Sequence, residues 1–250
     1  MSKKAIILVA GMGTRLKPLT LTTHKCLTKV NGIAILHNSL QRLKTIGVME
    51  VVLVVGYLGE EIKRDIGTEY NGMKILYVEN EQFTNTNTSY SLIKGLDALK
   101  EYDELFILEG DVFFEGSLLT KIDGDEHNNT TLVETYDPRL DGTFVEIGED
   151  GFIKDWTHKS MREEDYTLED KCKTINIHKF SKGFVDYTLY PAAKKVCDDT
   201  HGKAPLENIM RDIVRDDGSI IYGLLSNGSK WFEIDDENDL NIAEEIFKDA

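Results

Sequence analysis

Two cations flank a glycine-rich loop near the start of the sequence. The loop is Gly11-Met12-Gly13-Thr14, Arg15 follows it at once, and Lys25 comes ten residues later. Glycines let backbone amides approach a ligand closely, and fixed cations beside such amides suit a polyphosphate. This combination predicts a phosphate-binding loop, whose expected nucleotide contacts are Val9, Ala10, Gly11, Gly13 and Thr14.

Two better-known nucleotide motifs do not fit this loop. A P-loop needs Gly-Lys-Ser/Thr at a fixed spacing, and none follows here. A dinucleotide fingerprint needs a third glycine where Leu16 stands, and an acidic residue about 20 residues further on, which this sequence lacks. The remaining alternative is a plain surface loop after a strand.

Charge is distributed unevenly along the chain. The first 49 residues contain no Asp or Glu and carry +8, whereas the remaining 201 residues carry −23. A positively charged site on an otherwise acidic protein would attract a triphosphate, whereas the acidic remainder of the surface would repel duplex nucleic acid. A chance clustering of lysines on helix faces would not explain the missing acids.

An aspartate follows an apolar run further along the chain. The run 105–108 is expected to form a buried strand, and it leads into Glu109-Gly110-Asp111. Ligands of open parallel sheets lie at the carboxyl ends of the strands, where the glycine loop and the Gly56-Tyr57 turn are also expected. A magnesium ion that holds the triphosphate would explain a carboxylate at this position. The alternative is an aspartate that caps a helix or shapes a turn.

The elements that position these residues alternate between strand and helix. Apolar runs predict buried strands, and leucines at helical spacing predict amphipathic helices. The predicted strands are 5–9, 50–57, 74–78 and 105–108, and the predicted helices are 60–66, 89–99 and one that carries Leu36, Leu40 and Leu43. This alternation indicates an α/β fold with a doubly wound, mainly parallel, Rossmann-like sheet.

The pattern changes after about residue 116. Short antiparallel strands are predicted at 131–135, 144–147 and 152–156, and a further strand at 173–180. Helices 184–196, 205–214 and 237–247 and strands 220–225 and 231–234 complete the prediction. We expect one domain over residues 1–250, with a nucleotide-binding half (1–115) and a smaller, antiparallel acceptor-binding half (116–250) on the same sheet.

Composition excludes several classes of protein. With 250 residues, 41% hydrophobic and 29% charged, the chain is typical of a globular domain. No apolar run approaches the roughly 18 residues of a membrane span, and Met1-Ser2-Lys3-Lys4 leads into a strand rather than a signal peptide. The three scattered cysteines show no metal-ligand spacing. These features predict a cytoplasmic protein without membrane insertion and with reduced thiols.

The string from Gly11 to Thr20, followed by Lys25-Cys26-Leu27, resembles the signature of the nucleotidyltransferases that make sugar nucleotides and CDP-alcohols. Val9 departs from the alanine that is usual in that family, a change that should leave the chemistry intact. The resemblance implies that the Gly110-Asp111 pair carries the metal-binding aspartate.

A second metal ligand is implied by the resemblance of Trp231-Phe232-Glu233-Ile234-Asp235 to the same family. Asp236 and Asp239 are nearby rivals, because either could serve that role or cap the last helix. Alternation along the strand puts Glu233 and Asp235 on one face. We therefore prefer Asp235 as the ligand and Asp236 as the cap.

A closer resemblance comes from the segment 86–92. Thr86-Asn87-Thr88-Ser89-Tyr90-Ser91-Leu92 resembles the Asn-x-x-Tyr-Ser-Leu element of small bacterial cytidylyltransferases that charge phosphocholine and 2-aminoethylphosphonate. Segments 173–180 and 231–235 resemble the same group, so the resemblance covers most of the chain. It implies CTP, with Asn87 and the Gly56-Tyr57 turn near the pyrimidine. It also implies a lysine on the acceptor phosphate, for which Lys159 and Lys173 are candidates.

Three aromatic residues are candidates for contacts with the acceptor. Tyr90, Trp156 and Trp231 could surround a quaternary ammonium by cation–π contact, although such residues more often belong to a core. Where the phosphocholine enzymes carry a caging tryptophan, this chain has the segment Asp141-Gly142-Thr143-Phe144. This difference favours a smaller acceptor such as aminoethylphosphonate or hydroxyethylphosphonate.

Together these patterns predict a cytidylyltransferase that transfers CMP from CTP to a small phosphonate or phosphate and releases pyrophosphate. Its expected catalytic residues are Arg15, Lys25, Asp111 and Asp235, with Mg²⁺ on the two aspartates. The alternatives are a sugar-1-phosphate nucleotidyltransferase that uses UTP or TTP, and a nucleotide-binding subunit without catalysis. A homo-oligomer is possible, and the acceptor, the oligomeric state and the pathway stay open.

Overall fold

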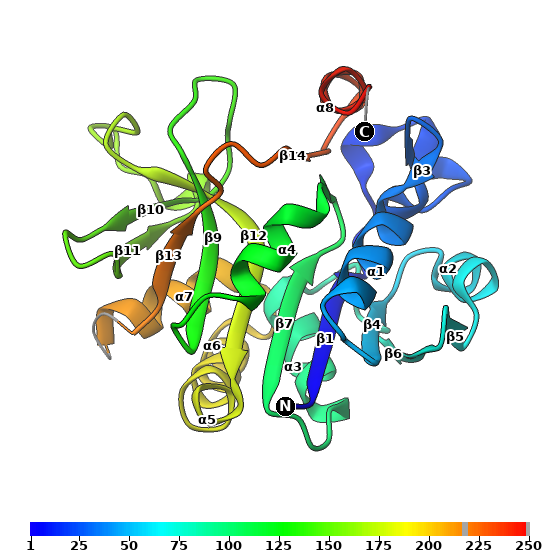
Figure 1. Ribbon diagram of the computed structural model, residues 1–250, viewed down its shortest axis with the longest axis horizontal. Helices are drawn as coiled ribbons and strands as arrows, with labels where there is room; N and C mark the ends of the chain where they lie inside the picture. Colours follow the sequence, from blue (N-terminus) through cyan, green and yellow to red (C-terminus); the bar gives the residue numbers. More distant parts are fainter. Residues whose placement is uncertain (217–219, 249–250) are drawn as a thin grey trace.

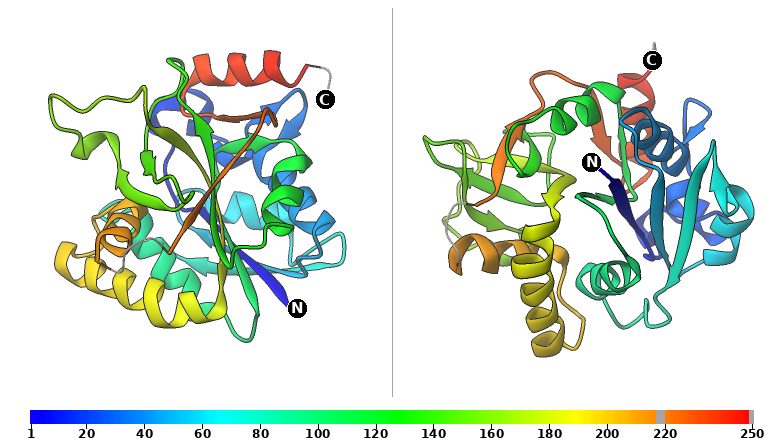
Figure 2. Two further views of the ribbon diagram at one scale, coloured as in Figure 1. Left: turned by 60° about the vertical axis from the view of Figure 1, so that its left-hand side comes forward. Right: turned by 60° about the horizontal axis from the view of Figure 1, so that its bottom comes forward.

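A computed structural model describes residues 1–216 and 220–248 of the chain. Figures 1 and 2 show a central sheet with helices on both faces and the last helix at one end. Within the described residues, no helix combines the length and apolarity that crossing a membrane requires.

Four parallel strands form the middle of a ten-stranded sheet, as the sequence predicts. In spatial order they are β7 (Glu104–Glu109), β1 (Lys3–Val9), β4 (Glu50–Val55) and β6 (Met73–Glu79). The short strand β5 (Glu69–Tyr70) pairs antiparallel with β6 at the edge. The carboxyl ends of β1 and β7 are therefore neighbours, which brings the glycine loop beside Asp111.

Alternation along the strands fills two cores. Ala5, Ile7 and Val9 of β1 pack on one face with helices α1 (Ile35–Thr45), α2 (Gly59–Ile66) and α4 (Gly116–Asp123). Ile6 and Leu8 face helices α3 (Thr88–Ala98), α6 (Tyr190–Thr200) and α7 (Leu206–Asp216) on the other side. Because both faces of the strand are buried, its sequence is a continuous apolar run.

The antiparallel strands extend the same sheet, again as predicted. β12 (Cys172–Ser181) pairs antiparallel with β7, and through β12 the sheet gains β9 (Asn129–Thr135) and β10 (Phe144–Ile147). Beyond these, β11 (Ile153–Thr157) pairs with β10, and β13 (Tyr222–Leu225) pairs in parallel with β9. Residues from both predicted halves of the chain therefore share one sheet.

The strand before Asp235 does not join this sheet. β14 (Trp231–Glu233) pairs antiparallel with β8 (Val112–Phe114), a strand that the sequence analysis did not predict. Helix α8 (Glu237–Ile246) then packs over the hairpin of β2 (Lys29–Val30) and β3 (Ile33–Ala34), at the top of Figure 1. A third core beneath α8 contains Leu16, Phe113 and Ile234. The end of the chain is thus fixed against its beginning.

The predicted helix 184–196 differs from the structure. The segment starts earlier, with α5 (Lys182–Phe184), continues through a π-helical turn at Val185–Leu189, and ends as α6. Pro191 has no amide hydrogen to donate to a carbonyl four residues earlier, so a regular α-helix would lose one bond here. A wider turn before the proline accommodates this loss.

Acidification is expected to destabilise the protein through a buried histidine on β12. His178 is 1% exposed, and its Nδ1 lies 3.0 Å from Thr131 Oγ1. Burial lowers the pKa of His178 from 6.5 to about 3. Between these values the unfolded chain binds a proton that the folded protein excludes, so stability falls as the pH drops below 6.5. About 3 kcal/mol should be lost between pH 7 and pH 4, measured as the free energy of unfolding in urea.

The variant His178→Gln removes the titrating group from this position. Over the same pH range it should lose about 3 kcal/mol less than the wild type, whatever its stability at pH 7. The matched control is His201→Gln, which replaces an exposed histidine at the end of α6. Equal pH dependence in His178→Gln and the wild type would contradict the role given to burial.

Candidate active site

The glycine loop lies directly against Lys25. Gly13 has a φ of +55°, and a side chain there would place its Cβ 2.9 Å from the Cβ of Lys25. The Thr20 hydroxyl donates a 2.8 Å hydrogen bond to the Gly13 carbonyl and fixes the turn. Three short 3₁₀ turns follow the loop, at Thr14–Leu16, Leu19–Leu21 and Lys25–Leu27. The tight turn therefore needs glycine and delivers Lys25 to the carboxyl end of β1.

Asp111 and Asp235 come together although they are far apart in sequence. Pairing of β14 with β8 sets Glu233 opposite Val112, and the Ile234 amide donates a 2.9 Å hydrogen bond to the Asp111 carbonyl. Gly110 permits the close approach of β7 to β1, because a Cβ there would lie 2.3 Å from Val9 Cγ1. The backbone itself thus holds the two aspartates side by side.

Asp236 and Asp239 act on the backbone, as predicted for Asp236. The Asp236 carboxylate accepts the Asp239 amide and caps α8, and Asp239 completes a capping box. Asp239 also accepts a 2.9 Å hydrogen bond from the Asp235 amide. Both carboxylates accept backbone amides at the start of α8. Of the three neighbouring aspartates, Asp235 is therefore the one that contacts Arg15 and Lys25.

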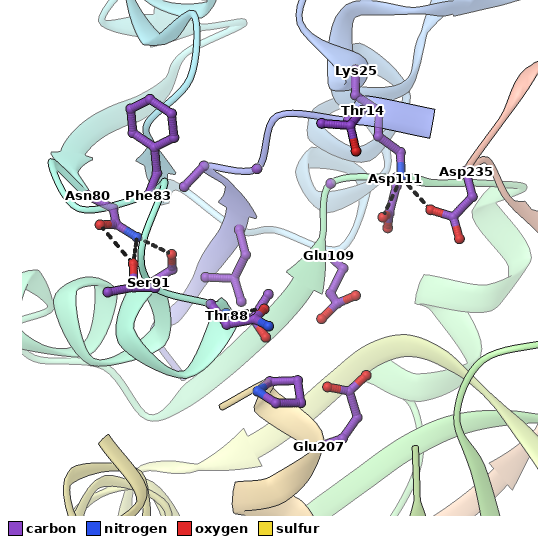
Figure 3. A pocket seen from close by; sticks show the side chains of 18 of the residues that line it. Thr14, Lys25, Asn80, Phe83, Thr88, Ser91, Glu109, Asp111, Glu207 and Asp235 are labelled. Atoms are coloured by element: carbon purple, nitrogen blue, oxygen red, sulfur yellow. Dashed lines mark hydrogen bonds and ion pairs between the residues drawn. The ribbon is translucent and has the colours of Figure 1, made fainter. Parts of the chain in front are cut away.

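Lys25 bridges the two aspartates. Its Nζ lies 2.9 Å from Asp111 Oδ2 and 2.7 Å from Asp235 Oδ1 (Figure 3), and Arg15 Nη2 lies 2.8 Å from the same Asp235 oxygen. Burial would lower the pKa of Lys25, but the two carboxylates outweigh it and raise that pKa. Burial would raise the pKa of Asp235, but Lys25 and Arg15 lower it by more. Lys25 and Asp235 therefore both stay charged at neutral pH.

A third carboxylate joins this pair. Oxygens of Asp111, Glu233 and Asp235 all lie within 4.8 Å of one another. Within the described part of the chain, Asp111 Oδ1 is buried and accepts no hydrogen bond. Converging carboxylate oxygens, one of them without a partner, suit a hard cation such as Mg²⁺. Glu233 was not predicted as a ligand, although its place two residues before Asp235 on the same strand face was the available signal.

Burial and neighbouring acids affect two glutamates in this region. Burial, together with Asp111 and Asp235, raises the pKa of Glu233 despite its 2.9 Å ion pair with Lys173. Burial also raises the pKa of Glu109 well above its usual range, and Glu207 adds to the effect. Glu109 precedes Asp111 by two residues, so the same strand periodicity brings it into the site. A ligand with positive charge would relieve this crowding of acids.

A cavity of about 630 Å³ runs from the glycine loop into the second half of the chain. Figure 3 shows Asn80, Phe83 and Ser91 on one side of it, Lys25, Asp111 and Asp235 on the other, and Glu207 across from Lys25. Most of the predicted nucleotide and catalytic residues line it, namely Ala10, Gly11, Gly13, Thr14, Arg15, Lys25, Asn87, Gly110, Asp111 and Asp235. Lining residues that were not predicted include Asn80, Phe83, Thr86, Thr88, Ser91, Glu109, His158, Ser160, Lys203, Glu207 and Glu233.

Fixed hydrogen-bonding groups occupy one end of this cavity. The Asn80 carboxamide is 2% exposed and donates to Thr86 Oγ1 at 3.1 Å and to Ser91 Oγ at 3.0 Å. Asn87 is exposed, and its side chain caps α3 by accepting the Thr88 amide at 2.8 Å. Asn80 follows the end of β6, so its position at a strand end was a usable signal that the sequence analysis missed.

Three residues predicted to contact the nucleotide do not line this cavity. Val9 is 3% exposed and packs in the core beneath Gly110. A Cβ on Gly56 would lie 2.7 Å from the Ala10 carbonyl, and the Tyr57 amide donates to that carbonyl at 3.1 Å. Neither Gly56 nor Tyr57 lines the cavity. The structure does not bring this turn into the cavity, and its contacts with the Ala10 carbonyl support the glycine loop.

The structure does not form the aromatic cage that the sequence allowed, and it places Trp156 in the core, the more frequent alternative. Trp156 is 1% exposed and packs in the core with Phe180, because β11 turns this face of the strand inward. The centre of the Tyr90 ring lies 5.8 Å from Lys94 Nζ, and Tyr90 does not line the cavity. The centre of the Trp231 ring lies 5.8 Å from Lys173 Nζ. These three rings serve separate parts of the fold, so they cannot enclose one ammonium.

The two candidate acceptor lysines line a second, adjoining cavity of about 180 Å³, together with Arg15 and Asp235. Lys159 begins the 3₁₀ turn Lys159–Met161, is 43% exposed and pairs with Asp141 at 3.2 Å. Lys173 is 2% exposed and donates to Glu233 at 2.9 Å and to the Thr174 carbonyl at 2.7 Å. Of the two, Lys159 is the more accessible to a ligand.

These features can be compared with known proteins. A family model described as "Nucleotidyl transferase" matches residues 4–154, more than half of the chain. The chain belongs to the nucleotidyl transferase family. The match includes Arg15, Lys25 and Asp111, while Asp235 lies beyond it.

Individual relatives of this nucleotidyltransferase include cytidylyltransferases. It is 30% identical over 241 residues to the CMP-5'-(3-aminopropyl)phosphonate synthase of Streptomyces rubellomurinus, a match that covers 96% of this chain but 38% of that protein. The chain thus spans well under half the length of this relative. It is 24% identical over 253 residues to the choline-phosphate cytidylyltransferase of Streptococcus pneumoniae, with 98% of both chains covered.

A solved structure supports the fold. The CTP:phosphocholine cytidylyltransferase from Streptococcus pneumoniae matches with a TM-score of 0.79 and 21% identity, over 99% of this chain and 100% of that one. This likeness confirms the Rossmann-like fold with its mixed sheet. The protein is therefore a nucleotidyltransferase with cytidylyltransferases among its relatives.

Proposed function

We propose that this nucleotidyltransferase transfers CMP from CTP to a small phosphonate acceptor and releases pyrophosphate. The observation that carries the proposal is the group Arg15, Lys25, Asp111 and Asp235 beside a cavity large enough for two substrates. The named activities of the two relatives support cytidine as the nucleoside. Residues 1–115 would hold the nucleotide, and residues 116–250 the acceptor, within one functional unit.

The reaction needs charge control rather than a general base. The acceptor oxygen is already anionic, so it can attack the α-phosphorus once repulsion between the two anions is suppressed. Arg15 would bind the leaving pyrophosphate, and Lys25 would stabilise the charge that develops on the α-phosphate. Asp111, Glu233 and Asp235 would hold Mg²⁺, which when bound neutralises phosphate charge.

The acceptor end favours a phosphonate that carries an amine. Lys159 is accessible in the adjoining cavity and would bind the phosphonate, a role for which buried Lys173 is less suited. Glu109 and Glu207, which are not among the proposed metal ligands, line the main cavity, and burial raises the pKa of Glu109. A primary ammonium would find favourable partners among these acids, whereas a neutral hydroxyl or a sugar would leave them crowded.

A substrate panel tests this proposal. Pyrophosphate release would be measured with CTP, UTP, TTP and GTP against aminoethylphosphonate, hydroxyethylphosphonate, phosphocholine and glucose 1-phosphate. CTP with aminoethylphosphonate should be the best pair. CTP should exceed UTP by about a hundredfold in kcat/KM, because a fixed site built for the cytosine amine leaves a group unpaired against uracil. Equal use of UTP, or faster turnover of glucose 1-phosphate, would refute the proposal.

A pair of variants locates the base. Asn87→Ser retains a side chain that can cap α3 but withdraws the carboxamide from the cavity, so the ratio of CTP to UTP turnover should fall. Asn85→Ser makes the same change at an exposed position two residues away and should leave that ratio unchanged. Identical ratios in both variants would remove Asn87 from the base site.

A further inference from the structure

The three acids of the candidate metal site are already paired with cations of the chain itself. Lys25 contacts Asp111 and Asp235 at 2.9 and 2.7 Å. Arg15 contacts Asp235 at 2.8 Å, and Lys173 contacts Glu233 at 2.9 Å. Three negative side chains thus meet three positive ones, and the group is close to neutral before any ligand arrives.

Of the three cations, Lys25 is the one that contacts both aspartates. Its Nζ lies between one oxygen of each aspartate, in the gap that a cation bridging the same two carboxylates would enter. The Lys25 side chain is 12% exposed and each aspartate 20%, so water screens repulsion between an ammonium and a divalent ion only weakly here. Lys25 and a metal ion would therefore compete for the same two carboxylates.

We infer that Lys25 holds the metal position in the nucleotide-free protein and releases it when the triphosphate arrives. Phosphate oxygens offer Lys25 and Arg15 alternative partners, and their departure leaves Asp111 and Asp235 free to bind the ion. Metal and nucleotide should then bind with positive coupling, and each should raise the affinity of the other by the same factor. The inference rests on the proposed nucleotide site but not on the identity of the acceptor.

Binding of Mn²⁺, a paramagnetic substitute for Mg²⁺, tests this competition without turnover. Free Mn²⁺ would be measured by electron paramagnetic resonance, first without nucleotide and then with CTP but no acceptor, and the Mn²⁺ that CTP binds in a protein-free sample would be subtracted. The wild type should bind Mn²⁺ weakly alone and at least tenfold more tightly with CTP. Lys25→Met should bind Mn²⁺ alone at least tenfold more tightly than the wild type, because two partly buried carboxylates lose their counter-ion.

Two variants serve as controls for charge and for general effects. Lys25→Arg keeps a positive charge near the aspartates and should remain a weak binder of Mn²⁺ alone. Lys29→Met removes an exposed lysine four residues away and should behave as the wild type. If Lys25→Met does not fold, the wild type alone still tests the inference. Equal Mn²⁺ affinity of the wild type with and without CTP would overturn it.

Failure of the inference and failure of the proposed function give different results. If CTP neither changes Mn²⁺ binding nor turns over, the proposed function fails. The nucleotide-free comparison between Lys25→Met and the wild type still tests the competition in that case. Equal Mn²⁺ affinity of these two proteins, with CTP turnover by the wild type observed, would leave the function standing and overturn the role of Lys25 at the metal position.

Discussion

Asp235→Asn is expected to reduce kcat by at least a thousandfold while the protein stays folded. The side chain keeps its shape but loses the charge that pairs with Lys25 and Arg15 and that a metal ion requires. Loss of one preorganised electrostatic contact costs about 10²–10³ in rate, and here two cations and the metal site are disturbed together. Steady-state pyrophosphate release at saturating CTP, acceptor and Mg²⁺ would measure the loss. Asp111→Asn should behave in the same way.

The neighbouring residue supplies a matched control. Asp236→Asn makes the same chemical change one position later, at the N-cap of α8, where asparagine caps as well as aspartate. Its turnover should stay within a few-fold of the wild type. Near-normal turnover of Asp235→Asn at saturating Mg²⁺ would contradict the assignment of Asp235 to the metal site.

Lys25→Ala is expected to lower kcat by two to three orders of magnitude. The ammonium is fixed beside the glycine loop, where it would stabilise charge on the α-phosphate in the transition state. Alanine keeps the Cβ that packs against Gly13, so the loop should retain its shape. CTP should still bind, because the loop amides and the base end of the cavity remain. Thermal unfolding would confirm that the variant is folded.

The kinetic constants separate two roles for Lys25. A fall in kcat with little change in KM identifies an interaction made in the transition state. A raised KM for CTP with unchanged kcat would instead show that Lys25 only binds the ground state. Lys29→Ala, at an exposed position of the same segment, is the control and should change neither constant. Together with Mn²⁺ binding, these measurements distinguish the proposed catalytic role of Lys25 from its role as a counter-ion of Asp111 and Asp235.

Local patterns in the sequence were sufficient for the fold and for part of the site. The apolar runs that end in Gly11 and in Gly110-Asp111 predicted parallel strands, and carboxyl ends of adjacent parallel strands must share an edge. The alternation from Glu233 to Asp235 and the capping potential of Asp236 were likewise readable, because they depend on residues within one turn or strand.

Other features depended on which elements pack together. The sequence allowed Trp156 either a ligand cage or, more often, a core position, and the packing of β11 against the helices buries it. Gly56-Tyr57 does follow the end of a strand, but its contacts are with the Ala10 carbonyl, and it does not line the cavity. The two-residue alternation along a strand specifies which face of the sheet a side chain is on, but not which element packs against that face.

The composition of the candidate metal site was decided by tertiary structure. Lys25 pairs with carboxylates 86 and 210 residues away, and Glu233 pairs with Lys173 from a different sheet. The sequence determined that cations follow the first strand and that acids end two later ones. Only the pairing of β14 with β8, fixed by α8 over the first hairpin, brought them within ion-pair distance, because side-chain partners across elements are set by register and packing.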